Sequence, residues 1–114
     1  MKNIFLKTDY FWEIIRKKLT GSVTFAFIFG SFAQGVEQEH SDIDLFVIGS
    51  IAEDDLIRVI GPLEKSTQRE INYILWDVKT FINRSKDHHL LKTIKKGNIV
   101  MLIGDEHEFR KAIR

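Results

Sequence analysis

The sequence predicts a single α/β domain of the α+β type, in which a mixed central sheet of about four strands is flanked by helices. Three observations support this prediction. The chain has 114 residues, a common length for one domain and enough to bury a core. Short β-branched and aromatic runs alternate with stretches of helical periodicity. No repeat, low-complexity tract or linker divides residues 1–114, so we expect one domain throughout.

A helix and a strand are expected at the start of the chain. Apolar residues within 10–19 recur at helical spacing, and Thr8 or Asp9 is the expected N-cap. Gly21 is expected to end this helix. Residues 22–29, SVTFAFIF, form a short β-branched and aromatic run, which predicts a strand.

The next segment predicts a short helix and a central strand. Residues 31–38, SFAQGVEQ, can form a short helix after a break at Gly30. In residues 42–49, DIDLFVIG, alternation places Asp42 and Asp44 on one face, together with the apolar residues at 46 and 48. Because both faces are apolar beyond Asp44, we expect this strand to be covered on two sides, with only its start at a polar opening.

The second half of the chain predicts a crossover and a return to the sheet. Residues 53–65 have an amphipathic helical pattern, which Pro62 weakens near its end. If this helix is a crossover, the strand predicted in 69–76, REINYILW, runs parallel to the aspartate strand. Two short helices, a strand and a closing amphipathic helix follow, in 77–85, 86–97, 98–104 and 105–114.

Composition excludes several classes of protein. The formal net charge of +1 argues against a dedicated nucleic-acid-binding protein, although it leaves room for a local basic patch. Because the chain has no cysteine, disulfides, thiolate metal sites and a cysteine nucleophile are excluded. The N-terminal segment lacks a signal-peptide core, and the longest apolar run, in 23–29, is too short to span a bilayer. We therefore expect a soluble cytoplasmic protein without a membrane partner.

Gly30 and Ser31 form a candidate phosphate-binding turn. They lie between a predicted strand and a predicted helix start, where free backbone N–H groups attract an anion. Glycine lets a ligand approach the backbone closely, and the hydroxyl of Ser31 adds a donor. Many strand-to-helix turns contain Gly-Ser for conformational reasons alone, so the pair does not define a site by itself.

Asp42 and Asp44 are candidate metal ligands. At strand spacing their Cα atoms lie roughly 6.5 Å apart, with both side chains on one face. Two such carboxylates can converge on a divalent ion, and Mg²⁺ prefers oxygen ligands that it shares with water and phosphate. In the alternative reading, Asp42 caps the strand start and Asp44 points to solvent. If the first two strands run antiparallel, the glycine turn and the two aspartates face each other.

Glu70 is the best-placed candidate for a third carboxylate. Two-metal phosphoryl transfer usually requires another acid beside the first two. If the strand of Glu70 runs parallel to the aspartate strand, both strands begin at the same edge of the sheet. The alternative is an ordinary solvated glutamate at a strand start.

Together these motifs resemble the signature of the minimal nucleotidyltransferases of the DNA polymerase beta superfamily. Residues 30–35, GSFAQG, and 41–49, SDIDLFVIG, match its usual form: a Gly-Ser pair, a turn of small residues, then Ser-Asp-hydrophobic-Asp-Leu. The segments REINYILW and NIVMLIGDE are more loosely similar to the C-terminal half of prokaryotic members.

The resemblance implies transfer of a nucleoside monophosphate, expected to be AMP, from a nucleoside triphosphate such as ATP to a hydroxyl acceptor. In that reading Gly30 and Ser31 would bind the β- and γ-phosphates. Asp42 and Asp44 would hold Mg²⁺, with two ions expected, and Glu70 would have to join them and activate the acceptor hydroxyl.

The chain departs from the family pattern near the expected triphosphate. Gln34 stands where family members often have arginine, so one positive charge is missing beside the nucleotide. Arg69 could supply that charge, or nucleotide binding could be weak.

The resemblance also implies a partner. Small stand-alone members are frequently encoded beside a helical HEPN-type toxin and neutralise it by adenylylation, so this chain resembles an MNT-type antitoxin. The alternative is a module with weak or no catalytic activity that keeps the fold and acts by binding its partner. Antibiotic nucleotidylation is less favoured, because such enzymes generally need additional chain to hold a sugar. Small size and high aromatic content leave a homodimer open.

Overall fold

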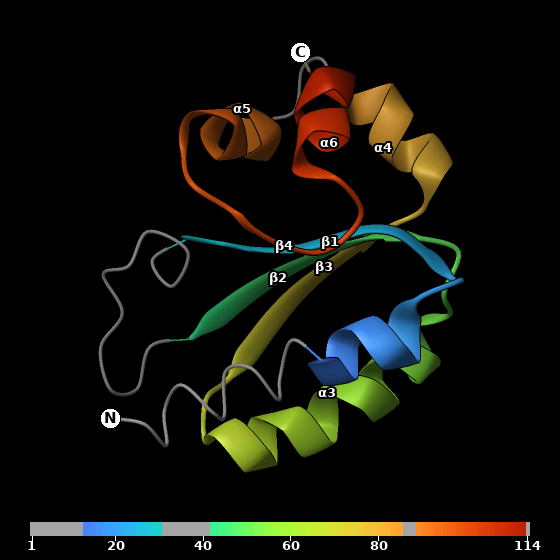
Figure 1. Ribbon diagram of the computed structural model, residues 1–114, viewed down its shortest axis with the longest axis vertical. Helices are drawn as coiled ribbons and strands as arrows, with labels where there is room; N and C mark the ends of the chain where they lie inside the picture. Colours follow the sequence, from blue (N-terminus) through green and yellow to red (C-terminus); the bar gives the residue numbers. More distant parts are fainter. Residues whose placement is uncertain (1–12, 31–41, 86–88, 114) are drawn as a thin grey trace.

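A four-stranded mixed sheet forms the centre of the described molecule (Figure 1). The structure is a computed structural model that describes residues 13–30, 42–85 and 89–113. The strands are β1 (Val23–Phe29), β2 (Ile43–Gly49), β3 (Ile71–Trp76) and β4 (Val100–Ile103), in the order β3-β2-β1-β4. The helices are α3 (Glu53–Thr67), α4 (Val78–Arg84), α5 (His89–Lys96) and α6 (Glu106–Ala112), and residues 13–19 are also helical.

The topology confirms both conditions on which the predicted site depends. Strand β1 runs antiparallel to its two neighbours, β2 and β4, so its end lies beside the start of β2. Strands β2 and β3 are parallel, and α3 is the crossover between them. Both β2 and β3 therefore begin at the edge of the sheet where β1 ends.

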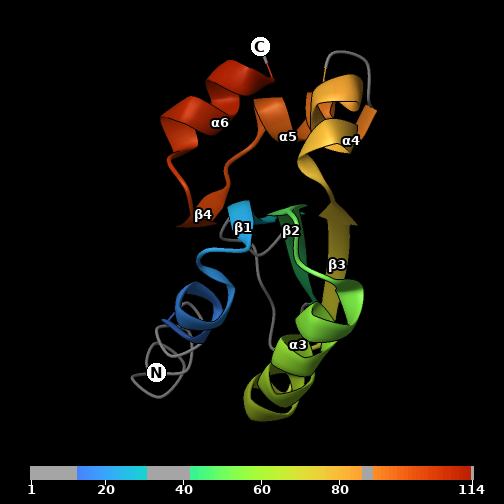
Figure 2. The same ribbon diagram turned by 90° about the vertical axis from the view of Figure 1, so that its right-hand side faces the viewer.

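Helices cover both faces of the sheet (Figure 2). The helix of residues 13–19 and α3 lie on one face, while α4, α5 and α6 lie on the other. The first face buries an aliphatic core, which includes Ile15, Leu19, Ile28, Leu45, Val47, Leu56 and Leu63. The second face buries a core rich in aromatic rings, which includes Phe27, Phe46, Ile48, Phe81, Leu91, Ile94 and Phe109.

Strand β2 is the central element of both cores. Leu45 and Val47 belong to the aliphatic core, while Phe46 and Ile48 belong to the aromatic core, and all four side chains are fully buried. The predicted alternation of faces and the two-sided cover of this strand are therefore confirmed. Asp44 shares the face of Phe46 because it lies two residues earlier on the same strand.

Helix α3 runs further than its sequence pattern predicts. It passes through the exposed Pro62 and continues to Thr67, where Gln68 takes a left-handed conformation with φ 56° and ends the helix. The expected end at residue 65 was therefore two residues short, because one proline removes a single backbone donor without ending the packing of Leu63.

Two side chains of α3 attach this helix to β3. The Oε2 atom of Glu64 accepts a hydrogen bond from the backbone N–H of Ile71 at 2.8 Å, and the hydroxyl of Tyr73 donates to Glu53. These contacts fix where β3 begins relative to the end of α3.

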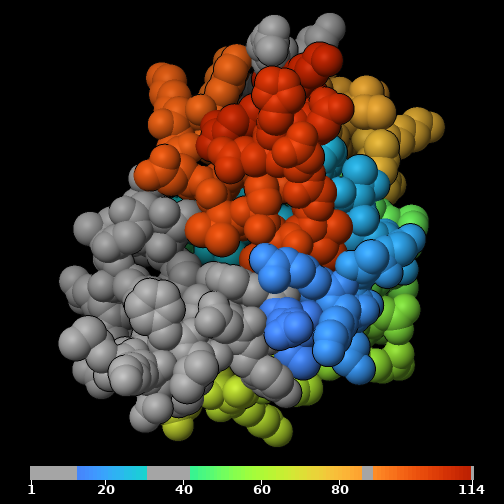
Figure 3. Space-filling model, in the orientation of Figure 1, coloured from blue at the N-terminus to red at the C-terminus, as the bar shows by residue number. Residues whose placement is uncertain are grey.

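The helix of residues 13–19 also contacts the β4 edge of the sheet. In the space-filling view, atoms of the β4–α6 segment, in orange and red, lie against the helix of residues 13–19, in blue (Figure 3). There the Nε of Arg16 donates to the backbone oxygen of Leu102 at 3.2 Å. The predicted caps Thr8 and Asp9 and the short helix predicted in 31–38 lie outside the described residues.

Within the part of the chain that the structure describes, no helix combines the length and the apolar character needed to cross a membrane.

Candidate functional site

Gly30 lies directly against the carboxylate of Asp44. The antiparallel register pairs Phe29 with Asp44, which brings the residue after β1 next to the start of β2. Gly30 has φ 77°, in the left-handed region that favours glycine. A Cβ atom at this position would overlap Oδ2 of Asp44. A larger residue at this position would force the Asp44 carboxylate to move.

The two aspartates lie on either side of Ile43, the first residue of the central strand. Asp42 is exposed and immediately precedes β2, while Asp44 is partly buried within it. Ile43, between them, packs in the aliphatic core, so strand alternation directs both carboxylates to the opposite face. The predicted shared face of Asp42 and Asp44 thus follows from the observed strand.

The environment of Asp44 disfavours its negative charge. Burial raises the pKa of this carboxyl, and the neighbouring charge of Asp42 raises it further, while a hydrogen bond from Asn72 lowers it. A carboxylate whose charge is desolvated and faces a like charge gains most from a nearby cation.

Asn72 is a site residue that the sequence analysis did not identify. The parallel register places it opposite Asp44, and its Nδ2 donates to Oδ2 of Asp42 at 3.2 Å. The available sequence signal was a single amide within the otherwise apolar run INYILW, at even spacing from Glu70. Because asparagine carries no charge, a pattern of acidic residues does not include it.

Glu70 lies at the expected edge of the sheet, immediately before β3. Its side chain is exposed, and its backbone oxygen accepts a hydrogen bond from the N–H of Ile43 at 2.9 Å. Within residues 13–30, 42–85 and 89–113, no three acidic, histidine or cysteine side chains are grouped to hold a metal ion. The role of Glu70 as a third metal-binding carboxylate therefore stays a prediction.

The remaining predicted site residues differ in how far the structure describes them. Arg69 is partly buried in the turn between α3 and β3, where its backbone N–H donates to the hydroxyl of Thr67 at 3.3 Å. Ser31 and Gln34 lie outside the described residues, so their phosphate-binding roles stay predictions.

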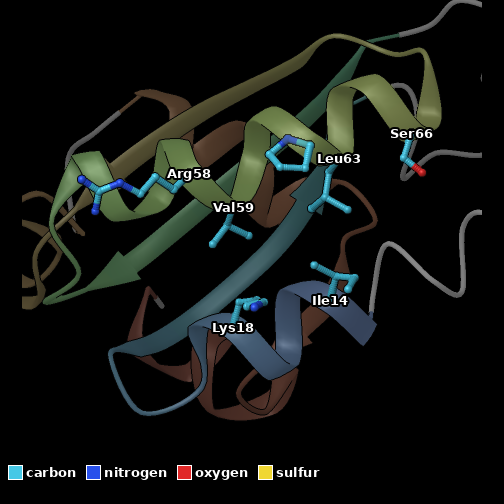
Figure 4. A pocket seen from close by; sticks show the side chains of 7 residues that line it. Ile14, Lys18, Arg58, Val59, Leu63 and Ser66 are labelled. Carbon is cyan, nitrogen blue, oxygen red and sulfur yellow. The ribbon is translucent and has the colours of Figure 1, made fainter.

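A pocket of about 380 Å³ lies away from the aspartates, between the helix of residues 13–19 and α3 (Figure 4). Its lining residues Ile14, Val59 and Leu63 belong to the aliphatic side of the sheet, opposite the face of Asp44. Lys18 and Arg58 also line it. The pocket is therefore separate from the carboxylate site.

The donor set of the carboxylate site fits Mg²⁺. This ion is commonly held by one or two carboxylates together with water and substrate phosphates. Asp42 and Asp44 supply two carboxylates, and Gly30, which has no side chain, lets the Asp44 carboxylate lie against the end of β1. These two carboxylates fit a divalent cation.

The fold and the site define a nucleotidyltransferase-type domain, in which a glycine after one strand faces two aspartates on the next. Residues 13–107 match the family model described as "Polymerase beta, Nucleotidyltransferase". The chain belongs to this family. A comparison with curated proteins found no match.

Solved structures support the same fold. The chain is similar to one in the toxin–antitoxin MntA–HpeT, solved as a double mutant, with TM-score 0.60 and 14% identity over 92% of this chain and 78% of that one. It is similar to a chain of a toxin–antitoxin with AMP-PNP, with TM-score 0.59 and 16% identity over 89% and 76%.

A third similar structure comes from Shewanella oneidensis. It contains a tri-AMPylated HEPN toxin in complex with an MNT antitoxin, and the match has TM-score 0.56 and 12% identity over 96% of this chain and 80% of that one. At these identities the three likenesses establish the fold of this chain.

Proposed function

We propose that this protein is a Mg²⁺-dependent nucleotidyltransferase that transfers AMP from ATP to a hydroxyl group on a partner protein. The observation that carries the proposal is the contact of Gly30 with Asp44, with Asp42 two residues earlier on the same face. A glycine backbone that a phosphate could approach, next to two carboxylates that could hold a cation, supports the proposal.

The chain's own residues position the reactants. Asp42 and Asp44 would hold Mg²⁺, which when bound neutralises phosphate charge and makes the α-phosphorus more electrophilic. Gly30, with Ser31, would bind the β- and γ-phosphates, and Gln34 and Arg69 would lie near the triphosphate. The acceptor oxygen then bonds to the α-phosphorus, the bond to pyrophosphate breaks, and the hydroxyl proton passes to a nearby base, for which Glu70 is our candidate.

A HEPN-type toxin is the partner we favour. The similar MNT antitoxin forms a complex with an AMPylated HEPN toxin, and another similar chain comes from a toxin–antitoxin with AMP-PNP. These similar structures support the proposal that this protein is an antitoxin that modifies its toxin. We place this activity in the cytoplasm, where ATP and Mg²⁺ are abundant.

The test uses ATP labelled on its α-phosphate, Mg²⁺ and a candidate HEPN-type partner. We expect label on the partner with the wild-type protein, and a loss of about a hundredfold with Asp42→Asn/Asp44→Asn, because the metal-binding charge is gone. Asp54→Asn/Asp105→Asn is the matched control, since it removes two exposed carboxylates elsewhere. Equal labelling by wild type and the Asp42/Asp44 variant would refute the proposal.

A second function is favoured by one observation. Asn72, rather than an acid, lies opposite Asp44, which suits a module with weak or no catalytic activity that acts by binding its partner. This alternative predicts that wild type and the Asp42/Asp44 variant protect the partner from toxicity equally, without label transfer.

A further inference from the structure

Asn72 lies where its side chain can orient Asp42, one of the two candidate metal ligands. It lies on β3 opposite Asp44, and its side-chain amide reaches Asp42, two residues before Asp44. The donor is Nδ2 and the acceptor is Oδ2 of Asp42, at 3.2 Å.

The direction of this hydrogen bond follows from the chemistry of the two groups. An ionised carboxylate only accepts hydrogen bonds, so the amide must present its nitrogen to Asp42. Turning the amide over would set its oxygen against a carboxylate oxygen. Because Asp42 is exposed, it lacks the packing that holds Asp44, and an external donor is needed to restrict its rotamers.

We propose that Asn72 is a positioning residue, which holds Asp42 in the orientation that binds the divalent cation; this inference rests on the proposed function. The amide acts on the metal through Asp42, as outer hydrogen-bond partners of metal ligands commonly do. Asn72 therefore contributes to metal affinity without adding charge to the site.

The neutrality of Asn72 has a measurable consequence. An aspartate at position 72 could bind the metal directly. Without the metal, its carboxylate would repel those of Asp42 and Asp44. Asn72→Asp should therefore lower the melting temperature in EDTA, and Mn²⁺ should raise the melting temperature of this variant more than that of the wild type.

The experiment measures Mn²⁺ binding in the presence of a nonhydrolysable ATP analogue, by calorimetry, together with melting temperature with and without the metal. We expect Asn72→Ala to weaken Mn²⁺ binding about tenfold, because Asp42 loses its fixed orientation. Asn83→Ala and Asn83→Asp are matched controls at an exposed position of α4, and we expect wild-type affinity from both.

Each outcome distinguishes the inference from a purely structural role. Unchanged Mn²⁺ affinity in Asn72→Ala, with only a lower melting temperature, would overturn the inference. The same holds if Mn²⁺ raises the melting temperature of Asn72→Asp no more than that of the wild type. Failure of the proposed function looks different: the wild type would then bind Mn²⁺ no better than Asp42→Asn/Asp44→Asn.

Discussion

Because Gly30 has no side chain, the carboxylate of Asp44 can lie against the end of β1. Two observations favour glycine at this position. Its φ of 77° is a left-handed conformation that other residues rarely adopt, and a Cβ atom would overlap the Asp44 carboxylate. Gly61 lies inside α3, where alanine adopts the same helical conformation, and a Cβ there would have no atom within 4 Å. A glycine-to-alanine substitution can therefore be compared at Gly30, where it is strained, and at Gly61, where it is not.

We predict that Gly30→Ala destabilises the protein by about 1–2 kcal/mol, through the left-handed conformation alone. It should also weaken Mn²⁺ binding, because the new methyl group displaces the Asp44 carboxylate. Urea unfolding and calorimetric titration measure the two effects.

Gly61→Ala is the control for this prediction. It should stabilise the protein by roughly 0.5–1 kcal/mol, since alanine is the better helix former, and leave metal binding unchanged. If Gly30→Ala binds Mn²⁺ as tightly as Gly61→Ala does, the close approach of Gly30 to Asp44 has no role in the site.

Residue types and spacing predicted that Gly30, Asp42 and Asp44 lie close together, and the structure brings them together. Gly30, Asp42 and Asp44 could be identified because turn chemistry, spacing and the apolar strand that follows all agree. Asn72 could not, because its importance comes from its position opposite Asp44, and an uncharged amide gives no signal in a search for acids. That position depends on how β2 and β3 pair, which the local sequence does not contain.

At the scale of elements, alternation was the strongest signal. The period of two in β2 predicted both of its faces, because each face packs against a different core. The end of α3 was less predictable, since Pro62 suggested an earlier weakening than the helix shows. The start of β3 follows from that end and from the bond between Glu64 and Ile71. The two-residue error at the end of α3 is matched at the start of β3, which begins at Ile71 and not at residue 69.

Helix α4 offers a test of a single element. Asp77 is its N-cap, and Oδ1 of Asp77 accepts a hydrogen bond from the backbone N–H of Thr80 at 2.7 Å. This bond lowers the pKa of Asp77. The helix positions Phe81, which packs on the rings of Phe25 and Phe109.

We predict that the stabilising effect of Asp77 depends on pH. Since its pKa is lower in the folded state than the ordinary value of 3.8, its contribution is complete above about pH 4 and is lost as pH falls through the lowered pKa. Asp77→Ala should therefore unfold at lower urea concentration than the wild type at pH 7. The two proteins should converge as the solution is acidified.

Asp105→Ala is the matched control for the capping prediction. Asp105 is the N-cap of α6, but its side chain makes no capping hydrogen bond. Its removal should have a smaller effect at pH 7. A difference between Asp77→Ala and wild type that stays constant from pH 7 to strongly acidic solution would show that the Asp77 charge does not stabilise α4.

At the scale of the whole molecule, the site depends on a sheet that two cores share. The aspartates, the glycine and Asn72 come from three adjacent strands, so no single element contains the site. Strand β2 lies between β1 and β3 and contributes buried side chains to both cores. Removing either core exposes this strand, and we expect the two halves of the molecule to unfold together for that reason.

This cooperativity can be measured by comparing two truncations on opposite faces of β2. Leu45→Ala, in the aliphatic core, should destabilise the protein by about 3 kcal/mol, and Ile48→Val, in the aromatic core, by about 1 kcal/mol.

The chain has two tryptophans, so Trp12→Phe leaves Trp76 as the only indole. Trp76 packs edge-on against Phe46 at 5.0 Å and reports on the aromatic core, while far-ultraviolet circular dichroism reports on the whole chain. In the Trp12→Phe background, both signals should give one urea midpoint for each protein, and Leu45→Ala should move both equally although it lies on the face away from Trp76. Independent cores would instead leave the Trp76 midpoint in place while the circular dichroism midpoint falls. That outcome would mean that the carboxylates, on the aromatic face, keep their geometry after the aliphatic face has opened.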